Sequence, residues 1–233
     1  MRYITYALTK SFKDFLSKWF WISTFVITAV PIILWGILFF FFSDSISLLI
    51  SSVIGYIPFL ESESVKDTLI FIIKILLYLQ TVLITVIIFL AFATEKIVRI
   101  LHKKYYQNIS LAGFGSFLEM AKVNIKSIAL FIFLAIILMP FLFVPGLNIF
   151  LQLFLWSILI KDPFLYDTAS IAATKEEYEK MKKAKIELLL LSVIAALFNF
   201  IPILNFFAPL FQIVIFSHYT FAKIKDFREG LHR

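Results

Sequence analysis

The sequence has no cysteine among its 233 residues, which excludes disulfide bonds and thiolate metal sites. It has only three histidines, His102, His218 and His232, and their wide separation does not match the ligand spacing of a metal site. Glycine and proline are also scarce, at six and seven residues, so flexible low-complexity linkers are not expected. These absences predict a chain without metal centres, disulfides or long linkers.

Charged residues are scarce as well, at 16% of the chain, against about 25% in an average soluble domain. Hydrophobic residues make up 61% of the chain. A soluble protein of this size has too little interior to bury so much apolar surface, whereas a lipid bilayer accepts it. We therefore expect an integral, multi-pass membrane protein whose main partner is the lipid bilayer.

Motifs of the common enzyme classes are missing too. The sequence contains no Walker loop, no GxSxG, no HExxH and no pair of carboxylates within an apolar run, so we expect neither enzyme activity nor a cofactor. The lack of an ATP-binding motif favours a channel or a secondary transporter over a pump. The net charge of +7 lies at the ends of apolar runs, which indicates contact with anionic headgroups and not with nucleic acid.

The expected fold class is an all-α membrane protein with two long transmembrane helices, two helical hairpins and amphipathic surface helices. The whole chain, residues 1–233, is expected to form a single membrane domain. Its expected segments are an amphipathic helix (1–18), a span (19–42), an outer acidic segment (43–68), a second span (69–94), a cytosolic amphipathic segment (95–126), a hairpin (127–160), a cytosolic helix (161–187), a second hairpin (188–222) and a tail (223–233).

The first span, residues 19–42, carries no charge and can cross a hydrocarbon core of about 30 Å at about 1.5 Å per residue. This run is longer than a secretory h-region, so we expect it to remain as a span. Pro31 is expected to kink it. The second span, residues 69–94, has one charge, Lys74, which is expected to reach the outer headgroups.

The two apolar blocks of the C-terminal half are each broken by a Pro-x-Leu-Asn sequence, and the two breaks form a weak internal repeat. Pro145 and Gly146 in the first break, and Pro202 in the second, are expected to form the turns. The arm after the first turn, residues 149–160, has 12 residues and reaches only about 18 Å as a helix. We therefore favour re-entrant hairpins over hairpins that cross the bilayer fully.

Four segments hold 20 of the 22 Lys and Arg residues: 1–18, 95–126, 161–187 and 223–233. Because cytosolic loops carry an excess of basic residues, these segments and both termini are expected on the cytosolic side. An even number of crossings must then separate each pair of basic segments. In the third segment, Thr174 and Glu177 predict a capping box at the start of a helix.

Four stretches of the C-terminal half resemble the CysZ family of bacterial inner-membrane proteins, which is grouped with the etoposide-induced 2.4 proteins. They are residues 144–148 (VPGLN), residues 164–167 (FLYD), the basic helix that ends near Lys185, and residues 201–209 (IPILNFFAP). The likeness covers residues 110–222 well and the earlier part by layout only. It implies a homo-oligomeric inner-membrane permease that takes up sulfate for cysteine synthesis. Where the family carries a basic pair before the first span, this chain has Lys18 alone.

Three residues are candidates for substrate binding. Asn148 and Asn205 stand where the second arm of each hairpin is expected to begin, so each either caps a helix or helps hold an anion at a helix N-terminus. Lys18 is the remaining cation near the first span. Asp167 is a possible cytosolic polar site, expected to cap the next helix or to pair with the nearby basic cluster.

The sequence thus predicts a CysZ-like permease or channel for a small oxyanion, most readily sulfate. The alternative is a membrane scaffold or interaction protein of the same fold that transports nothing, because a fold does not by itself define a function. The expected location is the bacterial inner membrane.

Overall fold

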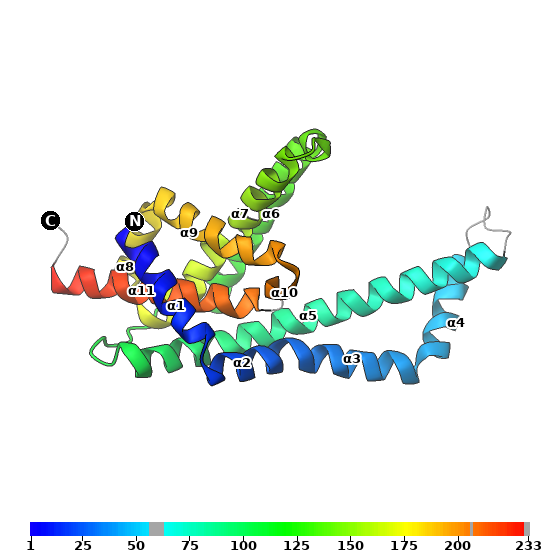
Figure 1. Cartoon of the computed structure of the whole chain (residues 1–233), viewed down its shortest axis with the longest axis horizontal. Helices are drawn as coiled ribbons and strands as arrows, with labels where there is room; N and C mark the ends of the chain where they lie inside the picture. The colour runs from blue at the N-terminus through cyan, green and yellow to red at the C-terminus, as the bar shows by residue number, and fades with distance from the viewer. Residues whose placement is uncertain (56–62, 206, 231–233) are drawn as a thin grey trace. The chain divides into compact units, whose positions relative to one another are not determined.

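The computed structural model describes residues 1–55, 63–205 and 207–230, and this part of the chain contains helices and turns but no strand (Figure 1). The predicted fold class is confirmed: the chain is an all-α membrane protein. The helices are α1 (Arg2–Phe15), α2 (Lys18–Thr24), α3 (Val30–Phe41), α4 (Ser43–Ile54), α5 (Glu63–Tyr105), α6 (Phe117–Leu138), α7 (Leu147–Ala172), α8 (Lys175–Lys183), α9 (Lys185–Leu197), α10 (Pro202–Asn205) and α11 (Ala208–Glu229).

Within the described residues, four helical stretches are long and apolar enough to cross a bilayer: Lys18–Phe41, Glu63–Tyr105, Phe117–Phe143 and Leu147–Ala172. The first two correspond to the spans expected at residues 19–42 and 69–94. α5 is much longer than a span requires, because its 43 residues extend over about 65 Å. It continues without a break through the basic residues that follow the apolar run.

The first span changes its winding just before Pro31. Residues Phe25–Ala29 form a π-helical turn between α2 and α3, and Pro31 lies in the first turn of α3. A proline has no N–H to donate, and its ring clashes with the carbonyl one turn earlier in an α-helix. The wider π turn before Pro31 leaves room for the ring. The Thr28 hydroxyl, which donates to the Thr24 carbonyl at 2.7 Å, binds one carbonyl within this region.

Residues 22–91 form one of two compact units, and hydrogen bonds join its helices. The indole of Trp35 donates to Thr85 at 2.8 Å, which links α3 to α5. The Lys74 ammonium donates to the Ser43 hydroxyl at 2.7 Å and to the Ser47 hydroxyl at 3.1 Å. Lys74 therefore holds the start of α4 against α5.

The other unit, residues 1–21 and 92–233, is built around α11. Helices α1, α7, α8 and α9 all pack against α11 (Figure 1). The contacts of α1 extend along its length, from Tyr3 with Asp226 to Phe15 with Phe211. Large side chains of α11 such as Phe211, Phe216 and Tyr219 are fully buried. The second arm of the second hairpin is therefore covered by protein along most of its length.

The prediction that the second arm of the first hairpin is short is wrong. α7 does not end at residue 160 but continues to Ala172, so it has 26 residues and a length of about 39 Å. Lys161 and Asp162 pair at 3.6 Å, and Pro163 is buried inside the helix without ending it. Both α6 and α7 are thus long enough to cross, and the argument that favoured a re-entrant first hairpin no longer holds.

The turn between α6 and α7 forms where Pro145 and Gly146 were expected to form it. Gly146 directly precedes α7 and has φ +83°. A residue with a Cβ atom would be strained in this conformation, whereas glycine adopts it readily. In the second hairpin, Pro202 begins the short α10, and α11 begins three residues after α10 ends.

Gly115 makes the closest backbone approach in the segment that follows α5. Its N–H donates to the Ser170 carbonyl at 3.2 Å, and a Cβ atom on it would lie 2.8 Å from the Ser170 Cβ. We expect Gly115→Ala to lower the free energy of unfolding in detergent by about 1–3 kcal/mol, because neither backbone can yield easily.

The matched control is Gly36→Ala in α3, where a Cβ atom would meet only the Tyr78 hydroxyl at an ordinary 3.9 Å. That change should stabilise the helix by about 0.5–1 kcal/mol. Thermal unfolding of the two purified variants gives the comparison. Equal shifts for both would contradict the close contact at Gly115.

Candidate functional site

The three predicted substrate residues do not meet in the described part of the chain. Lys18 is exposed at the first position of α2. The side-chain Oδ1 atom of Asn148 accepts a hydrogen bond from the side-chain amide of Gln152 within α7, and Asn205 is exposed at the end of α10. No hydrogen bond joins any two of the three among the described residues.

The expectation that Asn148 and Asn205 cap helices is wrong. The residue before α7 is Gly146, and Asn148 is already the second helical residue. The residue before α11 is Phe207, and neither Gly146 nor Phe207 makes a side-chain cap hydrogen bond. Gly146 takes the position before α7, and residues Pro202–Asn205 form α10, so neither asparagine stands at a cap position.

Asp167 lies inside α7, five residues before its end, and caps no helix. One of its carboxylate oxygens is buried and has no hydrogen-bond partner in the described structure. The next helix, α8, is capped by Thr174 instead. The predicted capping box is confirmed, because the Glu177 N–H donates to the Thr174 hydroxyl at 3.2 Å and the Thr174 N–H donates to Glu177 at 2.8 Å.

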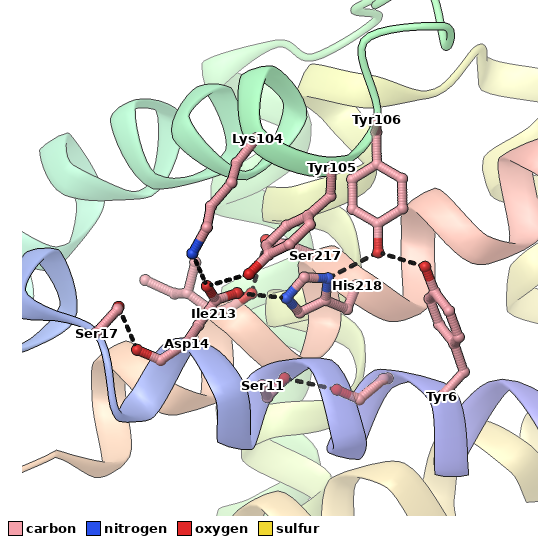
Figure 2. Close-up of polar contacts among 11 residues, drawn as sticks. Tyr6, Ser11, Asp14, Ser17, Lys104, Tyr105, Tyr106, Ile213, Ser217 and His218 are labelled. Atoms are coloured by element: carbon pink, nitrogen blue, oxygen red, sulfur yellow. Dashed lines mark hydrogen bonds and ion pairs between the residues drawn. The ribbon is translucent and has the colours of Figure 1, made fainter.

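The structure brings together a buried polar cluster that the sequence did not predict (Figure 2). Asp14 from α1 accepts three hydrogen bonds: from the Lys104 ammonium at 2.8 Å, from the Tyr105 hydroxyl at 2.9 Å and from Nε2 of His218 at 2.8 Å. The side chains of Asp14 and His218 are both 0% exposed. One carboxylate therefore joins α1, the end of α5 and the middle of α11.

These three donors decide the charge of Asp14. Burial alone raises the pKa of a carboxyl group because it penalises the charged form. The hydrogen bonds from His218, Lys104 and Tyr105 outweigh that effect, and the pKa of Asp14 lies below its ordinary value of 3.8. Asp14 is thus an anion at neutral pH, and the Nε2 atom that it contacts must carry a hydrogen.

The other side of the His218 ring leads toward the surface. Its Nδ1 atom lies 2.7 Å from the Tyr106 hydroxyl, which is 3.3 Å from the Tyr6 hydroxyl. With neutral His218, Tyr6 donates to Tyr106 and Tyr106 donates to Nδ1. With protonated His218, both hydroxyls reverse and every hydrogen bond is kept. The two tyrosine hydroxyls therefore connect the buried His218 ring to Tyr6, which is exposed.

Ion pairs join the basic segments of the chain within the unit of residues 1–21 and 92–233. The Arg228 guanidinium from α11 forms a bidentate pair with Glu177 of α8, with N···O distances of 2.7 and 3.0 Å. The Lys223 ammonium pairs with Glu187 of α9 at 2.7 Å. Together with Lys104 and Asp14, these pairs connect α1, the end of α5, α8, α9 and the end of α11.

Comparison with known proteins identifies the family. The family model described as sulfate transporter CysZ/etoposide-induced protein 2.4 matches residues 7–209. The chain belongs to this family. No curated protein and no solved structure matched it. As a CysZ/etoposide-induced 2.4 protein with four helices able to cross a bilayer, it is a multi-pass membrane protein.

Two features of the sequence of this CysZ-family chain point to the buried cluster. Asp14 is the only acidic residue among the first 18, in an otherwise basic helix, and His218 is the only Asp, Glu, Lys, Arg or His residue between Glu187 and Lys223. An ionisable residue inside an apolar run is expected to have a partner. The histidines were considered only as metal ligands, so the pair was missed.

We expect Asp14→Asn to lower the free energy of unfolding at pH 7 by about 1.5–3 kcal/mol, because three hydrogen bonds to a charged group are weakened. A carboxyl whose pKa is depressed by folding stabilises the fold above its unfolded pKa, and that contribution is lost as pH falls through the folded value. The difference between wild type and variant should therefore shrink as pH falls below about 3.8.

Denaturant unfolding in detergent between pH 7 and pH 3 measures this difference. Asp67→Asn, at an exposed position of α5, is the matched control and should change stability little at any pH. A difference for Asp14→Asn that stays constant down to pH 3 would contradict an ionised Asp14.

Proposed function

We propose that this chain is a CysZ-like permease or channel that carries a small oxyanion, most readily sulfate, across the bacterial inner membrane. The observation that carries the proposal is the family match over residues 7–209, whose description includes a sulfate transporter. Four helices of sufficient length and apolarity support a path through the bilayer. In this proposal the protein is no enzyme, needs no cofactor and works as a homo-oligomer.

The proposed orientation has both termini in the cytosol. Positive charge near the ends of spans favours the cytosolic side. All four basic segments lie within the unit of residues 1–21 and 92–233. Ion pairs join residues 1–18 to residues 95–126 and residues 161–187 to residues 223–233. Shared placement of all four on one side of the membrane agrees with these contacts.

Lys18, Asn148 and Asn205 remain our candidates for the substrate path, with altered roles. Each helix N-terminus carries about half a positive charge, and this charge is screened weakly where water is scarce. Asn148 lies in the first turn of α7, where its Nδ2 group can donate to an anion while its Oδ1 atom accepts from Gln152. Lys18, exposed on α2, would attract the ion without fixing it.

The alternative is a scaffold that transports nothing. It is favoured by one observation, namely that Lys18 stands alone where the family resemblance implies a basic pair. Transport and scaffolding differ in whether any ion moves through purified protein.

Radiolabelled sulfate uptake into liposomes that hold the purified protein tests the proposal. We expect uptake by the wild type and a reduction of about tenfold in the double variant Asn148→Ala and Asn205→Ala, because the loss of two polar contacts costs about 1.4 kcal/mol or more. Lys18→Ala should slow uptake less. Monodispersity in detergent confirms folding of each variant. No uptake by wild type under any gradient would favour the scaffold.

Single cysteines test the orientation, and the chain suits this test because it has none of its own. We expect an impermeant thiol reagent on intact cells to label Ser64→Cys but not Lys180→Cys. The reverse pattern would refute the orientation. Labelling of Gly146→Cys from outside would indicate that the first hairpin crosses fully, and protection from both sides would indicate that it is re-entrant.

A further inference from the structure

Helix α4 begins where the first span ends and turns away from the direction of α3 (Figure 1). One side of this helix is buried at Ile50. The other side exposes three large apolar side chains, Leu48, Leu49 and Val53. A contiguous apolar side of this kind marks contact with a further partner.

The depth of α4 in the bilayer follows from Lys74 of α5. Lys74 lies inside the apolar run of residues 69–94, and Phe71, about one turn before it, is exposed. The Lys74 ammonium has three acceptors in α4, namely the Ser43 hydroxyl at 2.7 Å, the Ser47 hydroxyl at 3.1 Å and the Ser43 carbonyl at 3.3 Å. Because an ammonium group has three N–H donors, α4 satisfies all of them without water. The start of α4 therefore lies at the depth of Lys74, within the apolar part of the span.

The exposed serines of α4 are also satisfied within the protein. The Ser51 hydroxyl donates to the Leu48 carbonyl at 2.8 Å, and the Ser52 hydroxyl donates to the Leu49 carbonyl at 2.7 Å. Hydroxyls that return to carbonyls of their own helix need no water, as a lipid environment requires. Neither serine therefore prevents this helix from lying in lipid.

The exposed apolar side of α4 continues a surface that begins on the first span. Phe40, Phe41 and Phe42 join α3 to α4 and are 78%, 75% and 56% exposed. A span presents such side chains to the acyl chains of the bilayer. Asp44 is the only charged residue of α4, and it stands in the first turn, where the helix N-terminus favours a carboxylate. The lipid-facing surface therefore extends from α3 onto α4.

We propose that α4 is embedded in lipid at the membrane face where the first span ends, with Leu48, Leu49 and Val53 in contact with acyl chains and with Lys74 as its anchor to α5. A helix in this position has its apolar flank in the hydrocarbon and its polar flank toward water. The part of the chain that lies in water between the two spans is then shorter than the segment 43–68 expected from the sequence. This placement is independent of what the protein transports.

Spin labels on single cysteines test this placement in the full chain in phospholipid nanodiscs, since the chain has no cysteine of its own. Power saturation compares collisions with oxygen, which concentrates in lipid, and with a nickel chelate, which stays in water. Leu49→Cys should give an oxygen-to-nickel ratio about tenfold above that of Ser51→Cys, because hydrocarbon excludes the polar chelate. Ser51 is the matched site, since it is exposed on the same helix and lies on nearly the opposite side from Leu49.

Two reference labels define the limits of the ratio. Ile37→Cys, at an exposed position within the first span, gives the value in lipid, and Lys180→Cys, exposed on α8, gives the value in water. A ratio for Leu49→Cys equal to that for Lys180→Cys would overturn the proposal by placing α4 in water. Exclusion of both reagents from Leu49→Cys would also overturn it, and a disulfide between two copies at that position would then identify a second copy as the occupant.

Lys74→Met tests the anchor, because methionine keeps an unbranched side chain but has no N–H to donate. We expect this change to broaden the distribution of distances between labels at Leu49→Cys and Leu76→Cys, measured by double electron–electron resonance. Leu76 is exposed on α5.

Lys66→Met is the matched control, because Lys66 lies on the same helix and makes no hydrogen bond to α4 among the described residues. It should leave the distance distribution unchanged. Monodispersity in detergent confirms the folding of each variant. The same distribution in the wild type, Lys74→Met and Lys66→Met would refute the anchoring role of Lys74.

Discussion

The buried carboxylate of Asp14 is the contact around which the larger unit is arranged. It lies in the first helix, yet its partners come from the end of α5 and the middle of α11. A carboxylate with no exposure is costly to desolvate, and the cost is offset only when donors occupy its oxygens in a fixed geometry. The positions of α1, Lys104, Tyr105 and His218 are therefore interdependent, since displacement of any one leaves a buried charge short of a partner.

The same requirement explains why α11 is protein core and not a lipid-facing helix. His218 is fully buried, and the rings of Tyr105 and Tyr106 lie against it, while α1, α7, α8 and α9 pack on α11. Thr168 of α7 and Thr220 of α11 add a further buried contact at 3.0 Å. The apolar residues of α11 are consequently buried by other side chains, although their composition resembles that of a membrane segment.

At the edge of this core the polar network reaches the surface through tyrosine hydroxyls. Tyr106 stacks on Phe221 with ring centroids 4.5 Å apart, which fixes its hydroxyl beside His218. Tyr6 continues the network to a pocket whose walls carry Lys104 and Lys225. Lys104 takes part in both the buried cluster and the pocket, so charge at the surface and charge in the core are linked through one ammonium group.

The sequence by itself determined the features that depend on neighbours along the chain. The uncharged residues 19–42 identify a span because hydropathy is a local sum, and Thr174 and Glu177 identify a helix start because a capping box closes within four residues. The tertiary structure alone decided that α7 continues past Pro163 and that Asp14 meets His218, 204 positions away. Those outcomes depend on which side chains surround a residue in space, and hydropathy and periodicity carry no information about that.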